Sequence, residues 1–129
     1  MNLAALAHRR AEQQPDHECL VFGARRTTYA QLVRDAAAVA ATWRVLGIEP
    51  GDHVAVDLSN CPEWVVAMVA AAHCGAVLVP LHPALGYHEL KYQLRHTDAQ
   101  LVVVSESVGD LEYSEFVDDM MEDLSLIHI

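Results

Sequence analysis

In the central third of the chain, the spacing of hydrophobic and polar positions changes from a period of two to a continuous apolar run and back. Residues 53–58 alternate between apolar and polar or small side chains, which predicts a β-strand. The apolar run over residues 62–74 predicts a helix, and a β-branched run over 76–79 predicts a second strand. Two strands around one helix within about 30 residues have the size of a βαβ unit. The pattern therefore predicts the core of an open, parallel α/β sheet.

Residues at both ends of the central helix predict where it starts and stops. Asn60 can act as the N-cap through its side-chain oxygen, and Glu63 stands where a capping box requires an acid. Pro62 falls in the first turn, where a missing N–H has no cost. Gly75 is placed to end the helix, and Pro80 closes the strand that follows.

The central helix is apolar on nearly every face, so it must be buried. Residues 64–81 have nearly the length of a membrane span, which needs about 20 apolar residues, and a span is therefore the competing interpretation. His73 and Gly75 interrupt this stretch, and Pro80 ends it. A capped helix leading into a strand that is covered on both faces explains the same residues. We therefore expect no transmembrane segment, and we expect Trp64 to lie in the core.

The residues before this unit predict a helix, a hairpin and a second helix. An apolar stripe at helical spacing predicts the first helix, and it consists of Leu3, Leu6, Ala7 and Ala11. Two extended runs, residues 18–22 and 26–28, surround a Gly-Ala turn and predict a β-hairpin. Thr28 and Gln31 form a capping box at the start of the second helix, which we expect to run for about five turns and to end at Gly47.

Two further elements follow the central unit. Tyr87, Leu90 and Leu94 mark one face of another helix, and the apolar run over residues 101–104 predicts a third parallel strand. The expected fold class is therefore α/β, with a partial parallel sheet of βαβαβ order preceded by a helix and a β-hairpin.

The charge of the chain is concentrated at its C-terminal end. The net charge is −10, but eight of the 18 acidic residues, and none of the eight basic ones, lie from residue 106 onward, which leaves −2 for residues 1–105. We therefore expect residues 1–105 to form the folded part of the chain and residues 106–129 to form an acidic, mobile tail. The last six residues, LSLIHI, fit neither part, and we expect them to be a non-native end. The near-neutral domain gives no reason to expect a nucleic-acid partner.

Cysteine usage and the N-terminus suggest a cellular location. Cys19, Cys61 and Cys74 are odd in number and have no CxxC spacing, which favours free thiols in a reducing compartment. The first residues lack the apolar core of a signal peptide. We therefore expect the protein to be cytoplasmic.

Metal and thiol chemistry receive little support from the spacing of the residues. His88 and Glu89 begin like a zinc-protease motif, but the next histidine is His96, eight residues on. Solvated or capping histidines explain the eight histidines better than a metal site does. Cys61 precedes a helix, where the helix dipole can activate a thiol, but its apolar neighbours favour a structural cysteine. We assign no catalytic and no metal-binding residue.

The sequence also contains no motif that predicts a phosphate-binding site. Lys91 is the only lysine, and the six glycines are scattered rather than gathered in one loop, so no cofactor-binding residue is assigned. Ligands of open parallel sheets bind beyond the carboxyl ends of the strands. That edge is expected to carry Ser59, Asn60, His82 and Ser105, although helix caps and ordinary loop residues explain the same positions.

Four consecutive stretches carry a resemblance to a known family: FGARRTTYAQL, LGIEPGDHVAV, LSNCPEWVVAMVAAAHCGAVLVPLHP and HELKYQLRHTDAQLVVV. Together they resemble the N-terminal region of the adenylate-forming, AMP-binding superfamily, from about residue 3 to 105. The resemblance implies that residues 1–105 are the N-terminal part of an AMP-binding domain, which is incomplete in this chain. The motif SNCPEW is more similar to the acyl-CoA synthetase branch. His82 departs from the family, which commonly has Asn or Asp at that position.

The resemblance implies the acetyl-CoA synthetase-like large N-terminal domain and an ATP-dependent acyl-CoA ligase, with a role in fatty acid metabolism. In such an enzyme a carboxylic acid attacks ATP to form an acyl-adenylate, which CoA then converts to the thioester. ATP, Mg²⁺ and CoA are implied for the full-length enzyme. The family's catalytic motifs match no position here, so we expect this fragment to be inactive. A peptide-synthetase adenylation domain and a stand-alone α/β interaction module are the alternatives.

Overall fold

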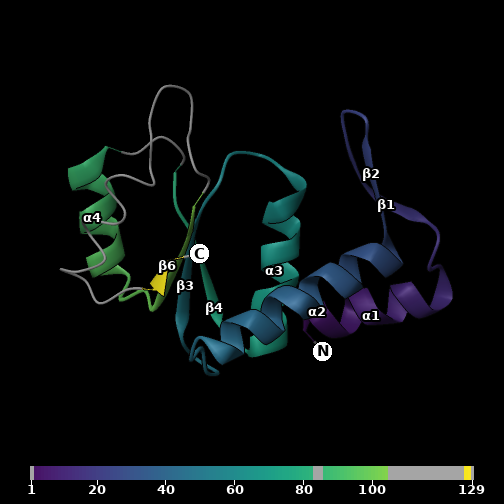
Figure 1. Ribbon diagram of the computed structural model, residues 1–129, viewed down its shortest axis with the longest axis horizontal. Coiled ribbons are helices and arrows are strands. Elements are labelled where there is room, and N and C mark those ends of the chain that lie inside the picture. Colours follow the sequence, from purple (N-terminus) through teal and green to yellow (C-terminus); the bar gives the residue numbers. More distant parts are fainter. Residues whose placement is uncertain (1, 83–85, 105–126, 129) are drawn as a thin grey trace.

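The fold is an α/β layer structure in which helices cover both faces of a small parallel sheet. The computed structural model describes residues 2–82, 86–104 and 127–128. Helices α2 and α3 lie on one side of the sheet, with α1 beneath α2, and α4 lies on the other side (Figure 1). The elements in chain order are α1 (Leu3–Gln13), β1 (Glu18–Phe22), β2 (Arg25–Thr28), α2 (Tyr29–Val45), β3 (His53–Asp57), α3 (Pro62–Cys74), β4 (Val77–Pro80), α4 (Tyr87–His96), β5 (Leu101–Val104) and β6 (Ile127–His128).

The sheet confirms the predicted parallel βαβαβ order. Strand β3 lies at its centre, with β4 on one side and β5 on the other, and both pairings are parallel. The short strand β6 pairs in parallel with β5 and was not predicted from the sequence. The hairpin of β1 and β2 forms a separate two-stranded sheet. Pro80 ends β4, which has no strand on its outer side among the described residues and so tolerates a missing N–H.

Helix α2 begins and ends as its sequence predicts. The Thr28 hydroxyl accepts a hydrogen bond of 3.2 Å from the Gln31 N–H, and the Gln31 side chain accepts one of 2.8 Å from the Thr28 N–H. Gly47 follows the helix with φ of 103°. The buried face of α2 consists of Leu32, Ala36, Ala40 and Trp43.

The start of α3 corrects the predicted cap. Cys61 is the N-cap and makes no side-chain capping bond, while Asn60 is exposed. The reason is Pro62, which forces the residue before it into an extended conformation, and Cys61 accordingly has φ of −159°. Glu63 forms no capping box and instead bonds Arg25 at 2.9 Å. Gly75 ends the helix in the left-handed region, as predicted.

Two predictions about buried side chains need correction. Leu3 and Leu6 are 40% and 45% exposed, and the buried residues of α1 are Ala4 and Ala7. The two alanines face α2 and α3, because small side chains allow the helices to approach closely. The two leucines therefore lie at the edge of this helix contact. Trp64 is half-buried and packs on the edge of the main core, whereas Trp43 lies inside it. In the described part of the chain, no helix has the length and hydropathy that crossing a membrane requires.

Candidate functional site

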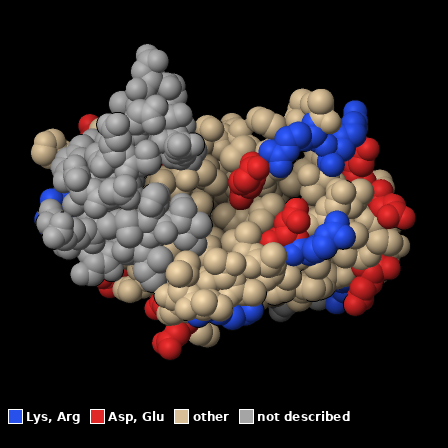
Figure 2. Space-filling view, in the orientation of Figure 1, with Lys and Arg blue, Asp and Glu red and all other residues tan. Residues whose placement is uncertain are grey.

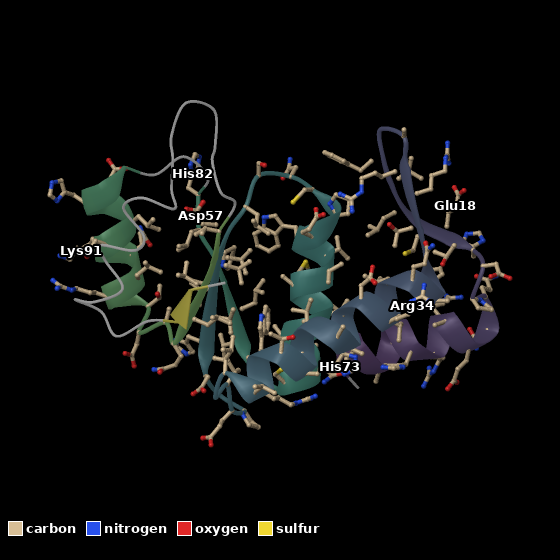
Figure 3. All side chains as sticks on the ribbon, viewed as in Figure 1. Glu18, Arg34, Asp57, His73, His82 and Lys91 are labelled. Atoms are coloured by element: carbon tan, nitrogen blue, oxygen red, sulfur yellow. The ribbon has the colours of Figure 1, made fainter. Side chains whose placement is uncertain are left out.

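The carboxyl ends of the parallel strands bring together most of the residues expected there. Ser59 and Asn60 lie in the loop after β3, and His82 follows β4 (Figure 3). All three are exposed. The fourth expected residue, Ser105, lies outside the described residues, as does most of the acidic segment.

Asp57 is a residue at this edge that the sequence analysis missed. It is the last residue of β3, it is fully buried, and neither carboxylate oxygen has a hydrogen-bond partner among the described residues. Burial raises the pKa of Asp57 to about 6, and the nearby charge of His82 partly opposes this shift. The two side chains lie next to each other in Figure 3. An acid on the inner strand of a sheet covered on both faces is the signal that could have identified this position.

An apolar cavity of about 540 Å³ lies between α2, α3 and the carboxyl ends of β3 and β5. Its lining consists of Val39, Trp43, Leu58, Ser59, Cys61, Glu63, Val66, Ala67, Val103 and Val104. Only the Ser59 and Glu63 side chains add charge or a hydroxyl to this wall. Apolar pockets with few polar groups are the usual form of small-molecule sites. On the face drawn in Figure 2, the larger groups of charged side chains lie over the hairpin and the first two helices.

Two hydrogen bonds fix the loop that borders the cavity. The indole N–H of Trp64 donates to the Leu58 carbonyl at 2.9 Å, which connects the end of β3 to the first turn of α3. The guanidinium of Arg25, in the hairpin, donates a hydrogen bond of 2.9 Å to the carboxylate of Glu63, and both side chains remain largely exposed. The hairpin is thereby attached to the rim of the cavity.

The thiol of Cys61 is not activated by its place at the start of α3. Burial raises its pKa, and the neighbouring Glu63 adds to this effect, while main-chain hydrogen bonds oppose it. A raised pKa keeps the thiol protonated and therefore a poor nucleophile. This agrees with the structural role expected from the sequence.

The described residues show neither a metal cluster nor a phosphate cradle. No group of three or more His, Cys, Asp or Glu side chains within them is placed to hold a metal ion. Four of the glycines have positive φ, but Gly23, Gly47, Gly51 and Gly75 lie in separate turns, so their N–H groups do not converge. Lys91 lies within α4.

This arrangement defines an open α/β domain, a class in which ligand sites lie at the carboxyl edge of the sheet. The chain belongs to the AMP-binding enzyme family, whose family model matches residues 7–127.

Individual relatives agree with this family. The long-chain-fatty-acid–CoA ligase of Bacillus subtilis (strain 168) is 36% identical over 94 residues, which cover 73% of this chain and 16% of the relative. The structure of a benzoate CoA ligase from Burkholderia xenovorans LB400 superposes with a TM-score of 0.86 at 23% identity, over 99% of this chain and 25% of that one. NpsA-ThdA, an artificially fused adenylation–PCP di-domain from Klebsiella oxytoca, superposes with a TM-score of 0.75 at 26% identity, over 81% of this chain and 20% of that one.

The match covers only part of each relative. The chain spans between 16% and 26% of the length of the curated relatives it matches. These comparisons also bear out the expected fold, since the superposed structures are acetyl-CoA synthetase-like adenylation domains.

Proposed function

We propose that this chain is the N-terminal part of an ATP-dependent, AMP-forming acyl-CoA ligase. The observation that carries the proposal is the family match over residues 7–127 together with relatives that are named as CoA ligases. In the longer enzyme a carboxylic acid would attack the α-phosphate of ATP, with loss of pyrophosphate, and the CoA thiol would then displace AMP. The work of such an enzyme on fatty acids, and its place in the cytoplasm, belong to the same proposal.

Within that enzyme the described residues would serve as scaffold. Catalysis of this reaction requires positive groups and Mg²⁺ positioned on the developing phosphate charge. The described carboxyl edge offers Asp57, two exposed polar residues and His82, and Lys91 is the only lysine of the chain. ATP, Mg²⁺ and CoA would therefore be held mainly by residues beyond these 129, and the 129-residue chain alone would be inactive.

The apolar cavity supports a carboxylic acid with an apolar body as substrate of the whole enzyme. Its wall is almost entirely aliphatic and aromatic, and it opens at the sheet edge where ligands of this fold class bind. A substrate chain placed there would contact Val66 and Val103 and leave its polar end near the exposed loop.

A second candidate is the adenylation domain of a peptide synthetase, and the superposition on NpsA-ThdA favours it specifically. Such a domain forms the same acyl-adenylate but passes the acyl group to a carrier protein. The two candidates differ in their acceptor thiol, and the described residues contain no acceptor site that distinguishes them.

The test is to read the gene beyond codon 123 and to express the complete protein. We expect purified protein to form acyl-CoA and AMP from ATP, CoA and an apolar carboxylic acid. Formation of the adenylate without transfer to CoA, together with a carrier domain downstream, would favour the peptide-synthetase candidate. A natural stop codon shortly after codon 123 would instead favour a stand-alone interaction module and contradict both enzymes.

A further inference from the structure

Two histidines from different helices meet on the helical layer, far from the carboxyl edge of the sheet. His8 lies in α1 and His73 in the last turn of α3, and their Nε2 atoms are 3.2 Å apart. The ring centroids are 5.0 Å apart, with an interplanar angle of 81°. Figure 3 places His73 at the opposite end of α3 from Asp57 and His82.

The separation of the two nitrogens matches the bite of a tetrahedral metal ion. Two Zn–N bonds of about 2.0–2.1 Å at a tetrahedral angle place their nitrogens about 3.3 Å apart. We propose that His8 and His73 form a surface site for a divalent transition-metal ion, such as Zn²⁺, Ni²⁺ or Cu²⁺, which bridges α1 and α3. Each imidazole would carry its proton on Nδ1 and give the Nε2 lone pair to the metal.

The surroundings of the pair keep it available as a ligand. His8 is exposed and His73 is partly buried, so a metal ion can reach the pair from solvent. Arg44 of α2 lies beside His73, since its guanidinium donates a hydrogen bond of 2.6 Å to the His73 carbonyl. The same positive charge repels a cation, so we expect moderate rather than tight affinity.

The two helices are already held together at this place, which reduces the ordering that binding requires. The Asn2 side-chain amide donates a hydrogen bond of 3.0 Å to the Ala72 carbonyl, next to His73, and its oxygen caps α1 at the Ala5 N–H. The rings therefore come from fixed backbones. Since the described residues supply no third ligand, water would complete the coordination, and imidazole ligands favour Zn²⁺, Ni²⁺ and Cu²⁺ over Mg²⁺ and Ca²⁺.

The experiment is a titration of the metal-free chain with NiCl₂ and with ZnCl₂, followed by calorimetry and by thermal unfolding. We expect one equivalent of metal to bind, the melting temperature to rise, and EDTA to reverse the rise. His8→Ala and His73→Ala should each weaken binding by about tenfold or more, because the second ligand acts as an intramolecular one. His17→Ala, at an exposed histidine outside the pair, is the matched control and should bind like the parent.

Further measurements separate a metal site from a structural contact. The Cu²⁺ complex of the parent chain should show two imidazole nitrogens by electron paramagnetic resonance, and His8→Ala should show one. If His73→Ala fails to fold, the exposed His8→Ala variant still decides the question. Equal binding by the parent and His8→Ala, or no binding of Ni²⁺ and Zn²⁺ by the parent, would overturn the proposal.

Discussion

The indole N–H of Trp64 donates a hydrogen bond of 2.9 Å to the main-chain oxygen of Leu58. This bond joins the first turn of α3 to the chain just beyond β3, and it fixes the loop that borders the apolar cavity. Trp64 thus has two roles, since its ring also packs on the edge of the main core. Packing and this hydrogen bond therefore explain the position of Trp64 without a role in ligand binding.

Trp64→Ala should lower the free energy of unfolding by about 3 kcal/mol and Trp64→Phe by about 1 kcal/mol, because both lose the hydrogen bond but Trp64→Phe keeps most of the ring packing. Urea unfolding followed by circular dichroism measures both. Val45→Ala, at a side chain that is 87% exposed, is the control and should change stability by less than about 0.5 kcal/mol. Equal losses for Trp64→Ala and Val45→Ala would contradict the packing described here.

Asp57 should make stability depend on pH. Its pKa rises to about 6 from an ordinary value of 3.8, so the folded state favours the protonated carboxyl. This contribution to stability is complete below the ordinary value and is lost as the pH rises through about 6. Asp57→Asn keeps a neutral side chain at every pH and should raise stability at pH 7.5 by about 2 kcal/mol, with little change at pH 3.5.

The measurement for Asp57 is urea unfolding at several pH values between 3.5 and 7.5, comparing the parent with the variant. The difference between them isolates this carboxyl from all other titrating groups. A parallel profile for Asp57→Asn and the parent would show that the carboxyl finds a partner that the described residues do not provide.

Gly75→Ala should destabilise the fold through two separable effects. Gly75 has φ of 68°, and a Cβ added there would lie 3.3 Å from the Cβ of Pro50. We expect a loss of about 2 kcal/mol, of which about 1 kcal/mol comes from the left-handed backbone alone. Gly23→Ala is the matched control, because Gly23 has φ of 59° but open space around it, so it should show only the backbone part. Thermal unfolding of the two variants gives the comparison, and equal losses would argue against the close contact with Pro50.

Much of the fold could be predicted because its signals are local. Thr28 with Gln31 encodes one helix start within four residues, and Gly47 and Gly75 mark two helix ends by their backbone freedom. The parallel strands follow from apolar runs separated by helices of ordinary length. None of these inferences needs knowledge of what lies across the core.

The errors concern contacts between distant parts of the chain. The sequence places Leu3, Leu6 and Ala7 on one helical stripe, and Ala7 is indeed buried, but only the packing of α1 on two other helices decides that Ala4 is covered while the two leucines are not. Asp57 was missed because the alternating pattern of residues 53–58 predicts a strand with one polar face, whereas the folded chain buries both faces of β3. The cap at Asn60 is a different case, because the effect of Pro62 on the preceding residue is local and could have been applied.

The candidate site was predicted only in outline. The rule that ligands bind at the carboxyl edge correctly located Ser59, Asn60 and His82, since it depends on strand direction alone. The apolar cavity could not be predicted, because it is formed by side chains of α2, α3 and two strands that meet only in the folded chain. The closeness of His82 to Asp57 likewise depends on the pairing of β3 with β4.

The central claim is that this chain carries the scaffold of an adenylate-forming enzyme without its catalytic groups. Carboxylate-dependent exchange of pyrophosphate into ATP, measured on purified protein ending at Ile129 together with a calorimetric titration of ATP, tests it most directly. We predict no exchange above background and no heat of ATP binding, because the chain has one lysine and its described glycines do not form a phosphate loop. Exchange above background would contradict the account and would mean that residues described here as scaffold build the active site.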